Sequence, residues 1–166
     1  SLYNNGAKHA LKTLHKDIRR VTADDFKHYD AVIHLGELSN DPLGQLNPAL
    51  TYQINCCGSV RLAALAKEAG VPRFIYSSSC SVYGIGNGEF KDENSEVNPQ
   101  TAYAECKVKV EQEVATMADD QFSPTFLRNA TAYGASPRMR FDLVLNNLTG
   151  LAWTTKEIKM NSDGTP

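Results

Sequence analysis

A tyrosine and a lysine four residues apart are the side chains of this sequence best suited to acid–base chemistry. Tyr103 and Lys107 stand in the segment Tyr-Ala-Glu-Cys-Lys, and on a helix residues i and i+4 lie one turn apart on one face. A phenol ionises near pH 10, but a neighbouring ammonium favours the phenolate and brings it toward the neutral range. The pair suits a general base with its activating cation, although a half-buried tyrosine beside a solvated lysine has the same spacing.

A run of hydroxyl side chains precedes this pair. Ser77, Ser78 and Ser79 end an apolar segment, and Cys80 and Ser81 follow them. A serine hydroxyl at the end of a buried strand can hold the oxygen of a reacting substrate. We therefore expect the serine run and the Tyr–Lys segment to contribute to one site.

Short apolar runs that alternate with amphipathic segments must position these residues. The pattern predicts strands over 11–14, 30–36, 73–79 and 123–128, helices over 22–26, 47–69, 101–117 and 141–152, and an extended segment over 157–160. Strands joined by long helical crossovers pair in parallel. The sequence therefore predicts an α/β fold, a doubly wound parallel sheet, whose ligands bind beyond the carboxyl ends of the strands at 35–37, 77–79 and 128–130.

The two longest helices have clear boundaries and apolar faces. Asn47 is a good N-cap before Pro48, and Gly70 suits a left-handed C-cap. The residues expected on the buried face of the first helix are Leu50, Ile54, Gly58, Leu62, Leu65 and Ala69. Those expected on the buried face of the second helix are Tyr103, Cys106, Val110, Val114 and Met117.

Composition excludes several classes of protein. The chain has 166 residues, which suits one domain, and a net charge of −2, which argues against a nucleic-acid binder. The longest apolar run, 62–66, is too short to span a membrane, and no signal peptide is visible. The spacing of the four cysteines and four histidines predicts neither disulfides nor a metal site, so we expect a cytoplasmic protein.

Several motifs occur together in a characteristic order. They are Asp17-Ile18-Arg19, Val32-Ile33-His34-Leu35-Gly36, Asn55-x-x-Gly58, Phe74-Ile75-Tyr76-Ser77-Ser78-Ser79, Val82-Tyr83-Gly84, Tyr103-x3-Lys107, and Leu127-Arg128 followed by Tyr133-Gly134. With them the chain resembles the extended short-chain dehydrogenase/reductases, the NAD-dependent sugar-nucleotide epimerase/dehydratase family, over about residues 11–164. The resemblance implies one partial Rossmann-like NAD(P)-binding domain over 1–166, with the substrate lobe starting at about 137.

The resemblance also implies a role for individual residues. Ser79 corresponds to the catalytic Ser/Thr, Tyr103 to the general acid/base, and Lys107 to the lysine that holds the nicotinamide ribose. The implied cofactor contacts are Asp17, Ile18, Leu35, Gly36, Glu37, Asn55, Ser77, Tyr103, Lys107, Asn129 and Ala130. The implied substrate contacts are Ser79, Cys80, Thr131 and Arg140.

The sequence departs from the family pattern at three places. The glycine-rich phosphate fingerprint of the first βα unit is absent, so we expect a fragment that does not bind a dinucleotide tightly by itself. Glu37 stands where the resemblance leads one to expect a small residue, and a carboxylate near a dinucleotide phosphate would repel it. Thr131 stands where many relatives have a substrate-binding asparagine.

The implied activity is epimerisation of a nucleotide sugar through transient hydride transfer, with NAD as the cofactor and NADP left open. Dehydratases of this family place an acidic residue just after the Ser/Thr, whereas this chain has Cys80 and Ser81 there, so dehydration is an alternative. A 3,5-epimerase/reductase that uses the Cys80 thiol is another, and a catalytically silent NAD(P)-sensing or scaffold protein is the alternative of a different class. We expect a homodimer and neither a nucleic-acid nor a membrane partner.

Overall fold

The computed structural model describes residues 13–39, 41–86 and 88–159. These residues divide into two compact units, one formed within 16–130 and the other within 131–159 together with 13–15. Each unit is described by itself below.

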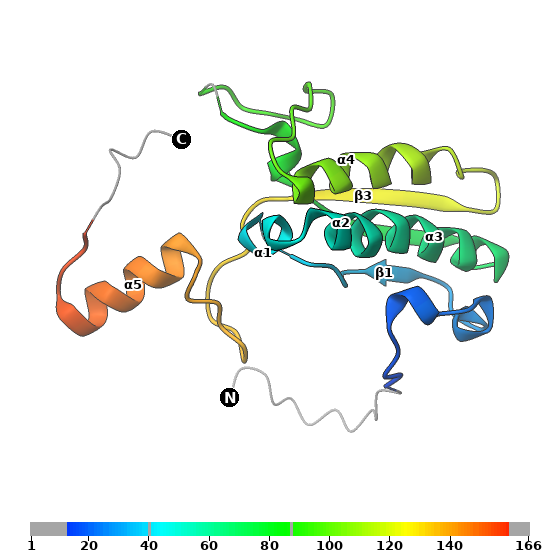
Figure 1. The fold of residues 1–166 in the computed structure, drawn as a ribbon, viewed down its shortest axis with the longest axis horizontal. Coiled ribbons are helices and arrows are strands. Elements are labelled where there is room, and N and C mark those ends of the chain that lie inside the picture. The colour runs from blue at the N-terminus through cyan, green and yellow to red at the C-terminus, as the bar shows by residue number, and fades with distance from the viewer. Residues whose placement is uncertain (1–12, 40, 87, 160–166) are drawn as a thin grey trace. The chain divides into compact units, whose positions relative to one another are not determined.

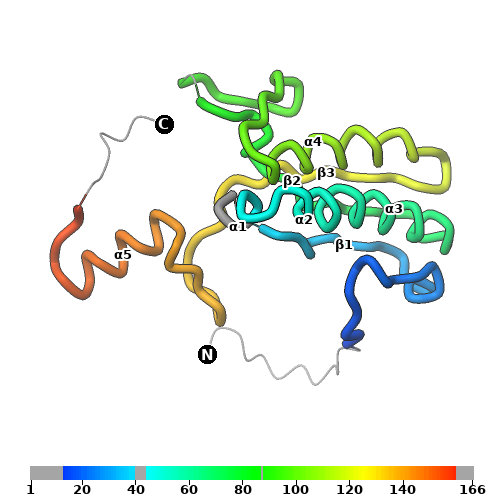
Figure 2. The backbone as a smooth tube through the Cα atoms, in the orientation of Figure 1, coloured from blue at the N-terminus to red at the C-terminus, as the bar shows by residue number. Residues whose placement is uncertain are grey.

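The first unit contains a parallel sheet of three strands. β1 (Val32–His34), β2 (Arg73–Ser79) and β3 (Ser123–Asn129) lie side by side in that order, as Figures 1 and 2 show. His34 pairs with Tyr76, and Tyr76 with Phe126. The predicted α/β class and parallel pairing are confirmed, and the three carboxyl ends form one edge, here called the carboxyl edge.

Helical segments precede and connect the strands. They are η1 (Ile18–Arg20), η2 (Ala23–Phe26) and η4 (Cys80–Tyr83), which are 3₁₀ helices, the π-helical η3 (Tyr52–Gly58), and the α-helices α1 (Asp41–Leu46), α2 (Pro48–Thr51), α3 (Ser59–Glu68) and α4 (Ala102–Ala115). Asn47 caps α2 through the backbone N–H of Leu50, and Thr101 caps α4 through that of Ala104. Gly70 adopts a φ of 77° after α3, so the caps predicted at Asn47 and Gly70 are confirmed.

One face of the sheet carries the core. Along β2 the side chains of Phe74, Tyr76 and Ser78 are buried under the helices, while those between them lie on the opposite face. Phe74 and Tyr76 pack with residues of α3, α4 and the loop before β3. These contacts fix the position of α4 against β2, and with it the position of Tyr103 and Lys107.

The first long helix buries a different face from the expected one. Thr51, Asn55 and Ser59 are fully buried, whereas Leu50 remains 37% exposed. The segment 52–58 is π-helical, and each π-turn takes about one residue more than an α-turn, which rotates the side chains that follow. The prediction was therefore wrong for Leu50, whereas Ile54 is half-buried and Gly58 and Leu62 are buried as predicted. Polar side chains are buried beside them.

Other expectations hold in part. Cys106, Val110 and Val114 of α4 are buried as predicted. The strand predicted over 11–14 is wrong for residues 13 and 14, which have no regular structure, while 11 and 12 lie outside the described residues. α1 was not predicted, and residues 157–159 form no strand; Met160 lies outside the described part.

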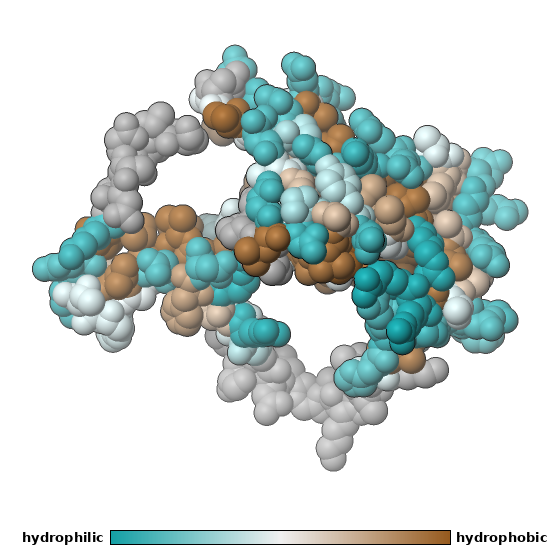
Figure 3. All heavy atoms as spheres, viewed as in Figure 1, coloured by the Kyte–Doolittle hydropathy of each residue, from teal (hydrophilic) through white to brown (hydrophobic). Residues whose placement is uncertain are grey.

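The second unit contributes α5 (Val144–Thr155), close to the helix predicted over 141–152. Asn146 is buried, accepts a hydrogen bond from the backbone N–H of Gly134, and donates one to the carbonyl of Arg140. Hydrophobic residues alternate with hydrophilic ones on the surface over α5 (Figure 3). Val144 and Trp153 of this helix are largely exposed. No helix in the described part of the chain is long and apolar enough to cross a membrane.

Candidate active site

The carboxyl edge brings the predicted catalytic residues to one region of the first unit. Ser79 is the last residue of β2, and η4 follows it directly. Tyr103 lies in the first turn of α4, and α4 packs against both β2 and η4. The packing of one helix thus places the Lys107 ammonium beside the serine run, and the Tyr103 ring lies near that ammonium.

Lys107 is buried, and its ammonium has defined neighbours. Nζ donates to the carbonyl oxygen of Ser77 at 2.5 Å. It lies 4.6 Å from the ring centroid of Tyr76 and 5.3 Å from that of Tyr103. The helical spacing therefore places a cation next to the Tyr103 ring, as the sequence predicts.

The Ser79 hydroxyl is oriented by its own chain. Its Oγ accepts hydrogen bonds from the backbone N–H of Ser81 at 3.2 Å and from the Ser81 hydroxyl at 2.9 Å. Two donors on one hydroxyl oxygen direct its own proton away from them. Ser79 is therefore suited to donate a hydrogen bond to an oxygen at the carboxyl edge.

The carboxylate of Glu37 turns into the protein. Its side chain is 3% exposed, and its Oε1 accepts hydrogen bonds from the Tyr76 hydroxyl at 2.6 Å and the Ser59 hydroxyl at 2.9 Å. Its Oε2 lies 2.6 Å from Lys107 Nζ as an ion pair, and among the described residues no hydrogen-bond donor is aligned with it. The negative charge thus faces a buried ammonium, not the surface of the sheet edge.

His34 completes this buried cluster. Its Nε2 lies 2.8 Å from the Ser59 hydroxyl. Because Ser59 donates to Glu37, we assign the Nε2 proton to His34, which then donates to Ser59. Burial is the main cause that lowers the pKa of His34, so the ring is neutral at physiological pH. The sequence analysis did not identify His34, Ser59 or Tyr76 as residues of the site. The signal that could have found them is the presence of polar side chains on a buried face.

Two of the expected cofactor residues lie before β1. The Asp17 carboxylate accepts hydrogen bonds from the backbone and guanidinium of Arg19, which hold the pKa of Asp17 well below its usual range. Ile18 packs so closely against η3 that a Cβ at Gly58 would lie 3.1 Å from Ile18 Cδ1. This pair thus sits beside η3 and α3.

The segment after β1 is fixed by Asn55. The buried Asn55 amide accepts from the Leu38 N–H at 2.9 Å and donates to the Leu38 carbonyl at 3.0 Å. Leu35 and Gly36 are exposed, and no atom lies within 4 Å of where a Gly36 Cβ would be. Asn55 therefore acts here on the loop that carries Glu37, and the backbone at Gly36 is open to a close approach.

The end of β3 lies beside the end of β2. Asn129 pairs with Ser79 in the sheet, and its side-chain amide donates to the Ser77 hydroxyl at 3.1 Å. Ala130 follows and is exposed. Of the remaining expected residues, Thr131 and Arg140 belong to the second unit, where Arg140 pairs with Asp142 at 2.5 Å.

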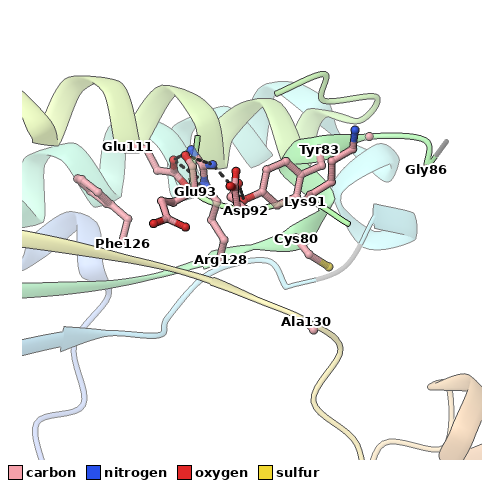
Figure 4. Close-up of a pocket in the computed structure, with 11 residues that line it drawn as sticks. Cys80, Tyr83, Gly86, Lys91, Asp92, Glu93, Glu111, Phe126, Arg128 and Ala130 are labelled. Carbon is pink, nitrogen blue, oxygen red and sulfur yellow. Dashed lines mark hydrogen bonds and ion pairs between the residues drawn. The ribbon is translucent and has the colours of Figure 1, made fainter. Parts of the chain in front are cut away.

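A cleft of about 730 Å³ opens next to β3 and η4 (Figure 4). Arg128 and Glu111 form an ion pair at its wall at 2.7 Å, and Ser78 donates to Glu111. Arg128 also donates to the Tyr83 hydroxyl at 3.1 Å, and Tyr83 donates to the Asp92 carbonyl at 2.6 Å. Cys80 is exposed and lines this cleft. Sequence reasoning did not single out Glu111, Arg128 or Tyr83 as site residues.

The cysteines and the possible metal ligands were also located. All four cysteines are unpaired. Over the described ranges of the chain, no group of three or more His, Cys, Asp or Glu side chains is placed to hold a metal ion.

Comparison with known proteins relates this chain to known enzymes. The chain is 33% identical over 88 residues to a UDP-glucose 4-epimerase of Rhizobium leguminosarum bv. trifolii, covering 53% of this chain and 25% of that protein. It is 33% identical over 109 residues to a UDP-glucose 4-epimerase of Lactobacillus helveticus, covering 64% of this chain and 33% of that protein. The chain therefore spans a third or less of the length of these curated relatives.

Solved structures share the fold over a longer range. The structure of MoeE5 in complex with UDP-glucose and NAD matches with a TM-score of 0.78 and 26% identity, covering 92% of this chain and 51% of that one. That of TunA, an NAD-dependent NDP-hexosamine 5,6-dehydratase, matches with a TM-score of 0.75 and 25% identity, covering 92% and 50%. The model of the NAD dependent epimerase/dehydratase family matches residues 4–166, so the chain belongs to the NAD dependent epimerase/dehydratase family.

Proposed function

We propose that this chain carries the acid–base site of an NAD-dependent epimerase that acts on a nucleotide sugar. The observation that supports it most is the Lys107 ammonium, 5.3 Å from the Tyr103 ring centroid, on a helix packed beside the end of β2. The curated relatives are UDP-glucose 4-epimerases, and a solved neighbour holds UDP-glucose and NAD. Together these support a site that removes and returns a proton on a sugar hydroxyl.

The side chains have distinct roles in this proposal. Tyr103 takes the proton of the sugar hydroxyl as a general base and later returns it as a general acid. Ser79 donates a hydrogen bond to the same oxygen, because its proton is directed away from Ser81. Lys107 supplies the positive charge that favours the phenolate. A bound nicotinamide would supply a reversible hydride acceptor for the carbon that carries this oxygen.

The residues present fit part of a dinucleotide. The Lys107 ammonium has three N–H groups, of which one donates to the Ser77 carbonyl, while Glu37 Oε2 lies 2.6 Å away as an ion pair. The ammonium thus retains N–H capacity for a ribose hydroxyl. The open backbone at Gly36 allows a ligand to approach the end of β1. Asn129 and Ala130, at the end of β3, would lie along the nicotinamide side, and Asp17 and Ile18 along the adenine side. Thr131 and Arg140, which belong to the second unit, remain proposed substrate contacts.

Epimerisation is favoured over dehydration by the residues after Ser79. Elimination of water needs an acid at the site, and the positions after Ser79 hold Cys80 and Ser81 instead of a carboxylic acid. Cys80 is exposed to the cleft, which supports a second candidate, a 3,5-epimerase/reductase that uses this thiol. The dehydratase neighbour TunA keeps dehydration as the third.

Replacement of Tyr103 by phenylalanine tests the proposal. In the full-length protein, assayed with UDP-glucose and UDP-galactose, Tyr103→Phe should lower kcat by a factor of about 10²–10⁴, because only the proton-transfer group is lost. NADH affinity, measured by fluorescence titration, should remain nearly unchanged. A variant with wild-type turnover would refute the role of Tyr103, and a wild type that binds NADH without converting any nucleotide sugar would favour the sensing or scaffold alternative.

A further inference from the structure

The ion pair between Glu37 and Lys107 is the unexpected feature of this site. The two side chains are 3% and 5% exposed, and their charged atoms lie 2.6 Å apart. Glu37 is held from three elements, since Tyr76 of β2 and Ser59 of α3 donate to it and Lys107 of α4 pairs with it. A carboxylate with such defined partners keeps one position, and so does the ammonium bound to it.

The other ionisable groups that face this pair are neutral at physiological pH. Burial lowers the pKa of His34 on β1 and raises the pKa of Tyr76 on β2. Burial likewise raises the pKa of Cys56 on η3 and, to about 12, that of Cys106 on α4. Glu37 and Lys107 are therefore the two buried charges next to this cluster.

Charged groups further along α4 are engaged elsewhere. Glu105 accepts a hydrogen bond from the Tyr52 hydroxyl, and Lys109 lies over the Tyr52 ring at 4.8 Å from its centroid. Glu111 pairs with Arg128 on β3. The electrostatic environment of Tyr103 on the buried side thus depends mainly on the balance between Glu37 and Lys107.

We propose that Glu37 is a positioning residue of the acid–base site, whose carboxylate holds the Lys107 ammonium against β2 and offsets part of the field by which that ammonium favours the Tyr103 phenolate. The inference deepens the proposed function and rests on the role given there to Tyr103. A cation acts on a neighbouring phenol through its charge, and a counter-charge in contact with the cation reduces that effect. Glu37 therefore sets how basic Tyr103 is, and its ion pair holds the Lys107 ammonium in one position.

Removal of the Glu37 charge tests this inference without any ligand. In Glu37→Gln the ionisation of Tyr103 should move to lower pH by about one unit. The measurement is the near-ultraviolet absorbance of the phenolate during a pH titration, taken as the difference between each protein and the same protein with Tyr103→Phe. In the full-length enzyme the limb of the kcat/KM profile that requires the base form should move in the same direction.

A matched variant separates a local from a general charge effect. Glu111→Gln also removes a buried carboxylate, one helical turn beyond Lys107, but its partner is Arg128. It should shift the ionisation of Tyr103 by less than half as much as Glu37→Gln does. An equal shift in both variants, or none in Glu37→Gln, would overturn the inference.

A double variant covers the case in which Glu37→Gln does not fold because it leaves the Lys107 charge unpaired. Glu37→Gln/Lys107→Met leaves no unpaired charge, should fold as judged by circular dichroism, and should ionise Tyr103 at higher pH than the wild type. An unchanged ionisation would show that the pair has no net effect on Tyr103 and would overturn the partial offset proposed here. If the titrations agree but the enzyme converts no nucleotide sugar, the proposed function fails and the role of Glu37 stands.

Discussion

Burial decides which side chains of the cluster around Lys107 carry a charge. His34 is 4% exposed, and the loss of solvent outweighs the opposing attraction of Glu37 in lowering its pKa. A histidine that is neutral in the folded state and ionises near pH 6.5 in the unfolded state links stability to pH. The same residue therefore gives a test of the buried network.

We expect the protein to lose stability as the pH falls below about 6.5, because the unfolded state then binds a proton at His34 that the folded state does not. The slope attributable to His34 is at most about 1.4 kcal/mol per pH unit. Urea unfolding at about pH 7.5 and pH 5.5 measures it, and the difference should shrink in His34→Gln. His28→Gln, at an exposed position, is the control; an equal effect of both substitutions would contradict the assignment.

The Cys80 thiol distinguishes the epimerase from the 3,5-epimerase/reductase. Its thiol is exposed to the cleft directly after Ser79. In Cys80→Ser the size is retained, but a hydroxyl is too weak an acid to replace a thiol in proton transfer. Epimerase activity should change little, measured as kcat in the full-length protein, whereas a loss of more than about a hundredfold would favour the epimerase/reductase.

At the scale of elements, the η4 segment and the loop after it depend on one glycine. Gly84 has a φ of 73°, and a Cβ there would overlap the Asn98 carbonyl oxygen. The backbone N–H of Asn98 donates a hydrogen bond to the Val82 carbonyl at 2.9 Å, which holds the two ends of the loop together. Gly84 thus fixes the wall of the cleft that Tyr83 and Arg128 line.

Gly84→Ala should therefore destabilise the protein by about 1–3 kcal/mol and displace the loop, because both the backbone conformation and the space are unsuited to a side chain. Gly88 is a matched control, since its φ is 81° but no atom lies within 4 Å of a Cβ there. Gly88→Ala should lower the free energy of unfolding only through its unfavourable backbone conformation, so its effect should be smaller than that of Gly84→Ala. Urea unfolding compares the two, and equal losses would show that the contact with Asn98 is unimportant.

Elements with strong local signals were predictable from the sequence. The boundaries of β2, the caps at Asn47 and Thr101 and the turn at Gly70 each follow from the types of a few neighbouring residues. The spacing of Tyr103 and Lys107 likewise required only a helix. The inward turn of Glu37 was not predictable, because its partners come from β2, α3 and α4, which are distant in sequence. The buried face of the first long helix was missed because no residue pattern marked the π-turns.

For the whole molecule, the sheet is covered by helices on one face only among the described residues of the first unit. On the opposite face Ile33 is 64% exposed and Leu127 is 45% exposed. Exposed apolar residues on the two outer strands of this face, β1 and β3, indicate a surface that is covered by further protein. The chain covers about half the length of the solved structures it matches, which leaves room for such a cover.

The 166-residue chain should not bind NAD with micromolar affinity by itself. Its sequence contains no Gly-x-Gly-x-x-Gly, the turn whose backbone N–H groups and following helix hold the pyrophosphate. The remaining residues offer contacts only to parts of the two nucleosides. Isothermal titration calorimetry with NAD measures this, and micromolar binding with a stoichiometry near one would show that the glycine-rich turn is dispensable.

The π-helical turns between Tyr52 and Gly58 bear on how this chain tolerates insertions and deletions. Deletion of one residue there would let the segment continue as an ordinary α-helix. Neither the length nor the helical content of the segment would then reveal the structural damage. Each residue of an α-helix turns the chain by about 100°, so Thr51 and Asn55 would rotate away from Ser59 and out of the buried face. A frame-preserving deletion in this segment should thus leave a folded protein whose loop after β1 has lost its anchor, and in a set of variant genes it would be counted as harmless by any screen for expression alone.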